Sequence, residues 1–218
     1  MTISGGSVTL TTTDDGINVA GGNDGSGQQD PAGQPGAGQP GAGGPGGGGQ
    51  DEFAVGDYSL TITGGTVVMD ADGDGVDSNG TATMSGGTVV VSGPTEEMNG
   101  AIDVQGTFDI SGGTLAAAGS AGMAQAPADG DQAVLGLRLG GTEPAGAVLQ
   151  IVADDGTTVA VFESTKDFSS FVFSSPDLEP GQTYEVFVGG TVDAETTGGL
   201  ASAGDLSGAT SLGTATAS

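Results

Sequence analysis

Hydrophobic and polar residues alternate along the first half of the chain, and pairs of glycines interrupt the alternation at regular places. Each interruption has the same form: an apolar and a hydroxyl residue, two glycines, then a hydroxyl and an aliphatic residue. The copies lie at residues 3–8, 62–67, 84–89 and 110–115. A two-residue hydrophobic period predicts β-strands with one buried face, and the glycine pair predicts a tight corner between two short strands.

The spacing of these copies indicates a repeat architecture. The last three begin 22 (84 − 62) and 26 (110 − 84) residues apart, which suits one supersecondary unit per repeat. A unit of this size cannot bury its apolar face alone, so neighbouring units have to stack and share a core. We therefore predict an all-β protein with a parallel β-solenoid over residues 1–131, interrupted by a Gly/Pro-rich loop insertion at 21–56.

From residue 132 onward, the alternation belongs to short segments that differ from the repeats. They lie at 134–139, 148–152, 159–162, 171–173 and 184–188. The sequence Asp154-Asp155-Gly156-Thr157 separates two of them and favours a hairpin turn. We predict a small antiparallel β cap and a tail over residues 132–218. The cap would cover the open end of the solenoid, because an uncovered strand edge promotes aggregation.

A second pattern lies between the glycine-containing copies. Residues 15–18, 74–77 and 100–103 can be superimposed, since the last two segments each end 7 residues before the next copy begins (84 − 77 and 110 − 103). Stacking would place equivalent residues in columns with a step of about 4.8 Å. The inward column consists of Ile17, Val76 and Ile102, and the outward column of Asn18, Asp77 and Asp103. Like carboxylates at this spacing repel each other unless a cation lies among them.

Composition restricts the function. The net charge is −26, with 28 acidic residues against two basic ones, and the chain has neither cysteine nor histidine. A basic patch for nucleic acid or for an anionic membrane surface cannot be assembled, and no segment suggests direct membrane insertion. Disulfides and thiolate metal sites are excluded. Because Met1 begins inside a repeat, we expect the chain to be a piece of a longer protein or a processed form.

Residues 70–77 alternate acidic residues with small ones, in the manner of a calcium loop without EF-hand spacing. Similar groups recur at Asp14, Asp15 and Asn18, and again at Asn99 and Asp103. Carboxylate and carbonyl oxygens suit Ca²⁺, whereas Zn²⁺ is not expected without histidine or cysteine. The alternative is that these acidic turns are only solvated surface.

Catalysis is not expected. A nucleophile–histidine arrangement is impossible, and exposed carboxylates lack the apolar pocket that would turn one of them into a general acid. A β-eliminating lyase usually pairs Ca²⁺ with a basic side chain. Only Arg138 and Lys166 are available, and both lie in the predicted cap.

Four segments, at 14–26, 73–80, 119–127 and 174–184, resemble the bacterial and archaeal carbohydrate-binding domain family of cell-surface, calcium-binding right-handed β-helix proteins. That family is similar to pectate lyases in fold and binds acidic plant polysaccharide and cellulose. The resemblance implies a right-handed parallel β-helix and a location outside the cell or at its surface. It also implies calcium ligands, or neighbours of ligands, at Asp14, Asp15, Asn18, Asp72, Asp74, Asp77, Asn99 and Asp103.

Together these observations predict a non-catalytic protein that binds acidic polysaccharide, polygalacturonate or cellulose being the candidates, with Ca²⁺ bridging the two anionic partners. Two alternatives stay open. The first is a structural surface or fibre subunit that self-assembles by end-to-end stacking of its β-helix, and the second is a weak polysaccharide lyase.

Overall fold

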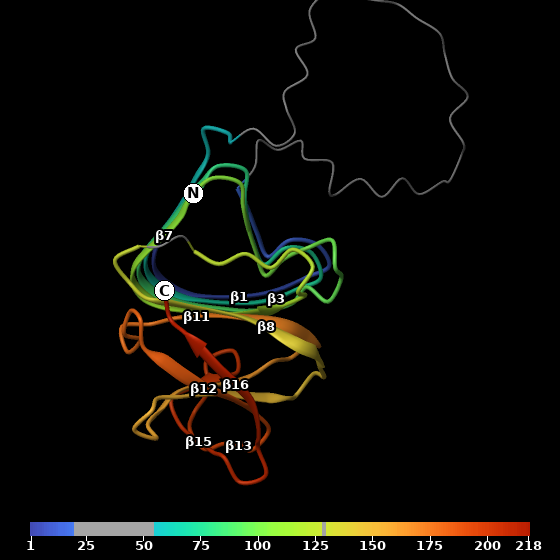
Figure 1. Cartoon of the computed structure of the whole chain (residues 1–218). Coiled ribbons are helices and arrows are strands. Elements are labelled where there is room, and N and C mark those ends of the chain that lie inside the picture. The colour runs from blue at the N-terminus through green and yellow to red at the C-terminus, as the bar shows by residue number, and fades with distance from the viewer. Residues whose placement is uncertain (20–54, 128–129) are drawn as a thin grey trace, which may run out of the picture.

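The structure is a computed structural model that describes residues 1–19, 55–127 and 130–218 (Figure 1). The described residues form strands and turns without a helix, which confirms the all-β class. The predicted loop at 21–56 lies outside the described residues except for its last two positions. The strands are β1 (Thr2–Thr12), β2 (Ile17–Val19), β3 (Ser59–Ala71), β4 (Val76–Ser78), β5 (Thr81–Ser92), β6 (Ile102–Val104), β7 (Phe108–Gly119), β8 (Val134–Glu143), β9 (Val148–Val152), β10 (Thr158–Glu163), β11 (Phe168–Ser174), β12 (Thr183–Val188), β13 (Thr191–Val192), β14 (Leu200–Ala201), β15 (Gly204–Asp205) and β16 (Thr210–Thr216).

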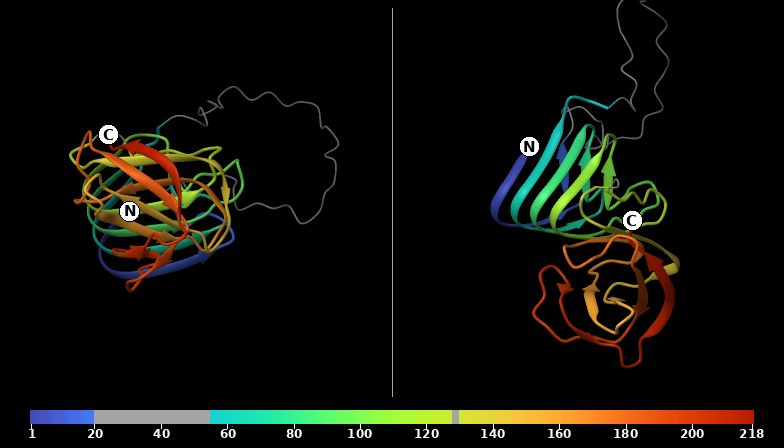
Figure 2. Two further views of the ribbon diagram at one scale, coloured as in Figure 1. Left: turned by 60° about the horizontal axis from the view of Figure 1, so that its bottom comes forward. Right: turned by 60° about the vertical axis from the view of Figure 1, so that its left-hand side comes forward.

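Long strands of successive repeats stack side by side in the N-terminal half. β1, β3, β5 and β7 pair in parallel in that order, and β2, β4 and β6 form a second, smaller parallel sheet. Equivalent residues are in register, so that Ile62 pairs with Met84 and Met84 with Ile110. The right-hand view of Figure 2 shows the long strands side by side. Repeated sequence therefore becomes repeated structure.

The first hydrophobic core lies between these two parallel sheets. In β3, β5 and β7 the alternate apolar residues on both sides of each glycine pair are buried, as the period of two predicts. They are Leu60, Ile62, Val67, Met69, Ala82, Met84, Val89, Val91, Phe108, Ile110, Leu115 and Ala117. Ile17, Val76 and Ile102 are buried with them, as the superposition of the second pattern predicts. Val8 in β1 is 40 % exposed, since β1 is the edge strand of its sheet.

The glycine pairs bend the long strands instead of ending them. β1, β3, β5 and β7 each run through their pair, where the sequence predicts two short strands and a corner. The pairing register shifts at the bend, and a bulge of this kind turns a strand without ending its ladder. The second glycine has a positive φ, +93° at Gly65 and +88° at Gly87, a region that residues with a side chain rarely adopt.

β11 closes one end of the stack. It pairs antiparallel with β7 on one side and with β8 on the other, which gives the sheet order β1-β3-β5-β7-β11-β8. Val172 of β11 belongs to the first core, whereas its neighbours Phe171 and Phe173 belong to a second one. One strand thus covers the outer edge of β7 and contributes to both cores.

The C-terminal strands also lie against the side of the stack, beneath it in Figure 1. A five-stranded sheet, β14-β10-β9-β12-β16, encloses the second core together with β8, β11 and the stacked strands. Val90 and Ala116 of the repeats are fully buried there, and the rings of Phe162 and Phe171 stack with centroids 5.1 Å apart. The predicted end cap is therefore a two-layer sandwich that shares a wall with the repeats.

The strand pairs of this sandwich follow the order of an immunoglobulin-type fold, with β8–β11 opposite β10–β9–β12–β16. The hydroxyl of Tyr184, at the start of β12, accepts the N–H of Glu179 at 2.8 Å, the tyrosine-corner arrangement of such sandwiches. The predicted hairpin turn at 154–157 joins β9 and β10, and the N–H of Ala153 donates there to the carbonyl of Thr157 at 2.8 Å. Within the described ranges we find no helix long and apolar enough to cross a membrane.

Candidate metal centre

The turns that precede β2, β4 and β6 connect acidic residues of one repeat to the backbone of the next. The N–H of Asp74 donates to Asp15 Oδ1 at 2.9 Å, and the N–H of Gly100 donates to Asp74 Oδ1 at 2.6 Å. Asp15, Asp74 and Gly100 hold equivalent positions. Each lies two residues before the first residue of β2, β4 or β6, and these first residues pair with each other. This ladder of carboxylates ends at Gly100 because glycine has no side chain.

Asp14, Asp15, Asp74 and Asp103 form a group that we call the acidic corner. Burial is the main reason that the pKa of Asp74 rises from 3.8 to about 6, and the charges of Asp103, Asp15 and Asp14 raise it further. The hydrogen bond from Gly100 acts in the opposite direction. Negative charge at this corner is therefore only partly compensated by the protein itself.

The predicted column of Asn18, Asp77 and Asp103 is in register across β2, β4 and β6. Asp77 is only 9 % exposed, although the sequence places it on an outward face. Asp103 Oδ1 accepts a hydrogen bond from Gln125 Nε2 at 2.9 Å, and Gln125 Oε1 accepts one from the N–H of Val104 at 3.1 Å. The side chain of Gln125 thus occupies the place that a following strand would take beside β6.

The other predicted ligands have separate roles. Asn18 donates through Nδ2 to Asp15 Oδ2 at 2.7 Å and so orients a member of the acidic corner. The backbone carbonyl of Asn99 accepts the hydroxyl of Ser120 at 2.8 Å. Asp72 forms an ion pair with Lys166 at 2.5 Å, and it shares this lysine with Asp70.

Both basic side chains of the protein are bound in the structure. Burial lowers the pKa of Lys166, but hydrogen bonds from its ammonium to Asp72 and Asp70 outweigh burial and leave this pKa above its ordinary value. Arg138 donates to the carbonyls of Ala121 and Ala124. Neither cation therefore neutralises the acidic corner.

Among the described residues, no three acidic side chains are placed to hold one metal ion by themselves. A hard cation at the acidic corner would need two carboxylates together with backbone carbonyls and water, a donor set that Ca²⁺ accepts because it takes six to eight oxygen ligands in flexible geometry. Asp15 and Asp74 each use Oδ1 for a backbone N–H. Such a donor set would draw on two of the four carboxylates of the acidic corner, with backbone carbonyls and water supplying the other oxygens.

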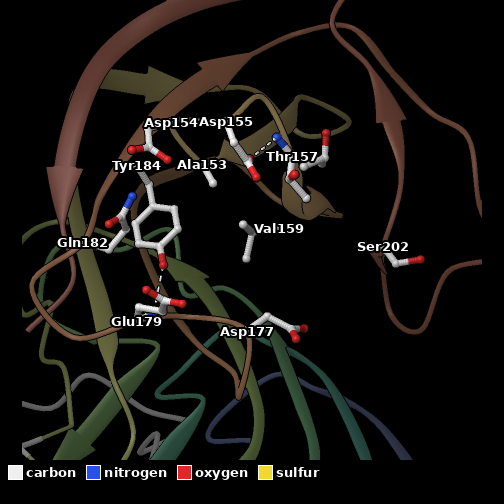
Figure 3. A pocket seen from close by; sticks show the side chains of 11 residues that line it. Ala153, Asp154, Asp155, Thr157, Val159, Asp177, Glu179, Gln182, Tyr184 and Ser202 are labelled. Atoms are coloured by element: carbon white, nitrogen blue, oxygen red, sulfur yellow. Dashed lines mark hydrogen bonds between the residues drawn. The ribbon is translucent and has the colours of Figure 1, made fainter.

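A hollow of about 460 Å³ lies in the sandwich, between the β9–β10 turn and the segment before β12 (Figure 3). Its lining includes Asp154, Asp155, Asp177 and Glu179 and contains no basic residue. The hydroxyl and then the backbone N–H of Thr157 lower the pKa of Asp155, which keeps this carboxyl ionised. Sequence reasoning misses the hollow because two segments far apart in the chain form it.

Comparison of the chain with protein-family models, with curated proteins and with solved structures returned no match. Any function proposed for the protein therefore depends on the residues and contacts of this chain alone. Sequence reasoning also misses two pairings. Asp70 binds Lys166 of the C-terminal half, and Gln125, which follows the last repeat strand, binds Asp103.

Proposed function

We propose that the protein is a non-catalytic module that binds acidic polysaccharide through Ca²⁺ at the acidic corner, outside the cell or at its surface. In this proposal residues 1–131 form a right-handed parallel β-helix, and residues 132–218 form the antiparallel part that covers its end and side. Calcium held by the acidic corner keeps coordination positions open for uronate carboxylates. The ion thereby bridges two anionic partners that would otherwise repel each other.

The observation that carries this proposal is the gathering of Asp14, Asp15, Asp74 and Asp103 from three successive repeats, with a raised pKa at Asp74. The protein does not use its two basic side chains there. A protein of net charge −26 loses stability from such unbalanced charges, and a bound divalent cation would remove that loss.

The two alternatives have less support. End-to-end stacking needs two open ends, and β11 hydrogen-bonds along the outer edge of β7. A lyase needs a basic side chain beside its metal, and Arg138 and Lys166 are bound elsewhere.

The deciding experiment measures thermal unfolding and polygalacturonate binding, each with calcium and with a chelator. We expect calcium to raise the melting temperature and to permit binding. If calcium raises the melting temperature but polygalacturonate does not bind, the protein is a calcium-stabilised structural protein and the polysaccharide part of the proposal is wrong. If neither quantity changes, the acidic corner is solvated surface and the proposal is wrong.

Asp77→Ala and Asp103→Ala test the column beside the acidic corner. Each should lower the melting temperature in calcium and weaken uronate binding, because Asp103 contributes to the negative potential at Asp74 and Asp77 is its partner in the neighbouring repeat. Asp109→Ala, on an exposed position of β7, is the matched control. If both variants have the melting temperature of the wild type in calcium, Asp77 and Asp103 do not contribute to a metal site.

A further inference from the structure

Three oxygen atoms at the end of β3 surround the ammonium group of Lys166. Nζ lies 3.0 Å from Asp70 Oδ1, 2.5 Å from Asp72 Oδ1 and 2.8 Å from the carbonyl of Ala71. Lys166 itself comes from the turn between β10 and β11. These contacts join the stacked repeats to the sandwich at one point.

Neighbouring contacts hold this arrangement in place. The hydroxyl of Thr165 donates to Asp70 Oδ2 at 2.7 Å, so both oxygens of Asp70 are bound from the same turn. The side chain of Lys166 is 17 % exposed, whereas that of Asp72 is 61 % exposed. The site is thus enclosed on the side of the lysine stem and open to water at Asp72.

The donor set has the chemistry of a site for a hard cation. Two carboxylates and a backbone carbonyl provide only oxygen atoms, which Ca²⁺ binds at about 2.3–2.6 Å, with water able to complete its shell. Lysine is a compact point charge with three donors. The ammonium of Lys166 contacts each of the three oxygens, so it takes the place that a bound metal ion would have.

We propose that Asp70, Asp72 and the carbonyl of Ala71 form a cation site, that Lys166 fills this site, and that Ca²⁺ binds there when the ammonium is removed. In the wild type the junction of repeats and sandwich is then independent of calcium. The inference goes beyond the proposed function, because it concerns other residues and holds even if the acidic corner binds no metal.

The test compares the wild type with Lys166→Met, which keeps an unbranched stem but no charge. In a chelator, Lys166→Met should melt lower by about 5 °C, since two carboxylates lose their partner. Calcium should then raise the melting temperature of Lys166→Met more than that of the wild type. Calorimetric titration should find one more calcium ion per chain in the variant.

Two further variants make the result specific. Adding Asp72→Asn to Lys166→Met should abolish the extra ion. Arg138→Met removes the other basic side chain, whose partners are the carbonyls of Ala121 and Ala124, so calcium should not restore its stability. An equal calcium count and an equal calcium shift in Lys166→Met and the wild type would overturn the inference. If Lys166→Met does not fold in chelator, folding on addition of calcium supports the inference and failure to fold overturns it.

Discussion

Asp74 lies at the centre of the acidic corner, and its surroundings act on its carboxyl group in opposite directions. Burial and the charges of Asp103, Asp15 and Asp14 favour the protonated form, while the N–H of Gly100 favours the ionised one. The result is a pKa of about 6 instead of 3.8. Because the folded-state pKa is raised, the contribution of Asp74 to stability is fully present below pH 3.8 and is lost as the pH rises to about 6.

Asp74→Asn tests this balance. In a chelator at pH 7 the variant should be more stable than the wild type, because the side-chain amide oxygen would still accept the N–H of Gly100 without a buried charge. The part of the stability change between pH 4 and 6 that comes from Asp74 should disappear. Urea unfolding midpoints measured across this pH range check both effects. A variant that is less stable than the wild type in chelator at every pH would contradict this account.

The bent strand is the element that makes the repeats stack. The second glycine of each pair has a positive φ. In the three copies after the first, it also lies against the backbone of the preceding repeat: a Cβ on Gly87 would lie 2.8 Å from the carbonyl oxygen of Gly65. The glycine pair therefore serves the bend and the close approach of neighbouring repeats together. This explains why the motif recurs with both glycines in every copy.

Gly87→Ala should destabilise the protein by about 2 kcal/mol or more, since the left-handed conformation alone costs an alanine roughly 1–2 kcal/mol. The crowding against Gly65 adds to this cost. Gly140→Ala in β8 is the matched control, because a Cβ there meets nothing within 4 Å. Urea midpoints give the comparison. Equal stability of the two variants would show that the bend does not require glycine.

At the scale of the whole molecule, charge and packing act against each other. A net charge of −26 on a chain with two basic residues produces repulsion over the entire surface. Burial of apolar side chains in the two cores offsets this repulsion. β11 couples the cores because Val172 packs in one and Phe171 in the other. The repeats and the sandwich should consequently unfold together.

Salt should therefore stabilise the protein. Screening lengths fall from about 10 Å at 0.1 M to 3 Å at 1 M ionic strength, so we expect the melting temperature to rise with NaCl in a single cooperative transition. Calcium at the same ionic strength should raise it further if it binds at the acidic corner. Calorimetry with matched NaCl and CaCl₂ series measures both. Insensitivity to NaCl would show that surface repulsion is a minor part of stability.

The sequence by itself determined the features that depend on local order along the chain. A period of two decides which face of a strand is apolar, so Leu60, Ile62 and the equivalent residues of β5 and β7 could be assigned to the core. Equal distances between motifs decide which residues meet when repeats stack, so the pairing of Asp77 with Asp103 could also be derived.

Only the tertiary structure decided how segments far apart in the chain meet. β11 pairs with β7 although β8, β9 and β10 lie between them in sequence, because a strand edge accepts any strand of suitable direction. Lys166 lies 94 positions from Asp72, and nothing in either local pattern indicates that a lysine balances this carboxylate while Asp74 has no such partner. Local periodicity records burial, whereas the choice of partner for each charge depends on the packing of the whole chain.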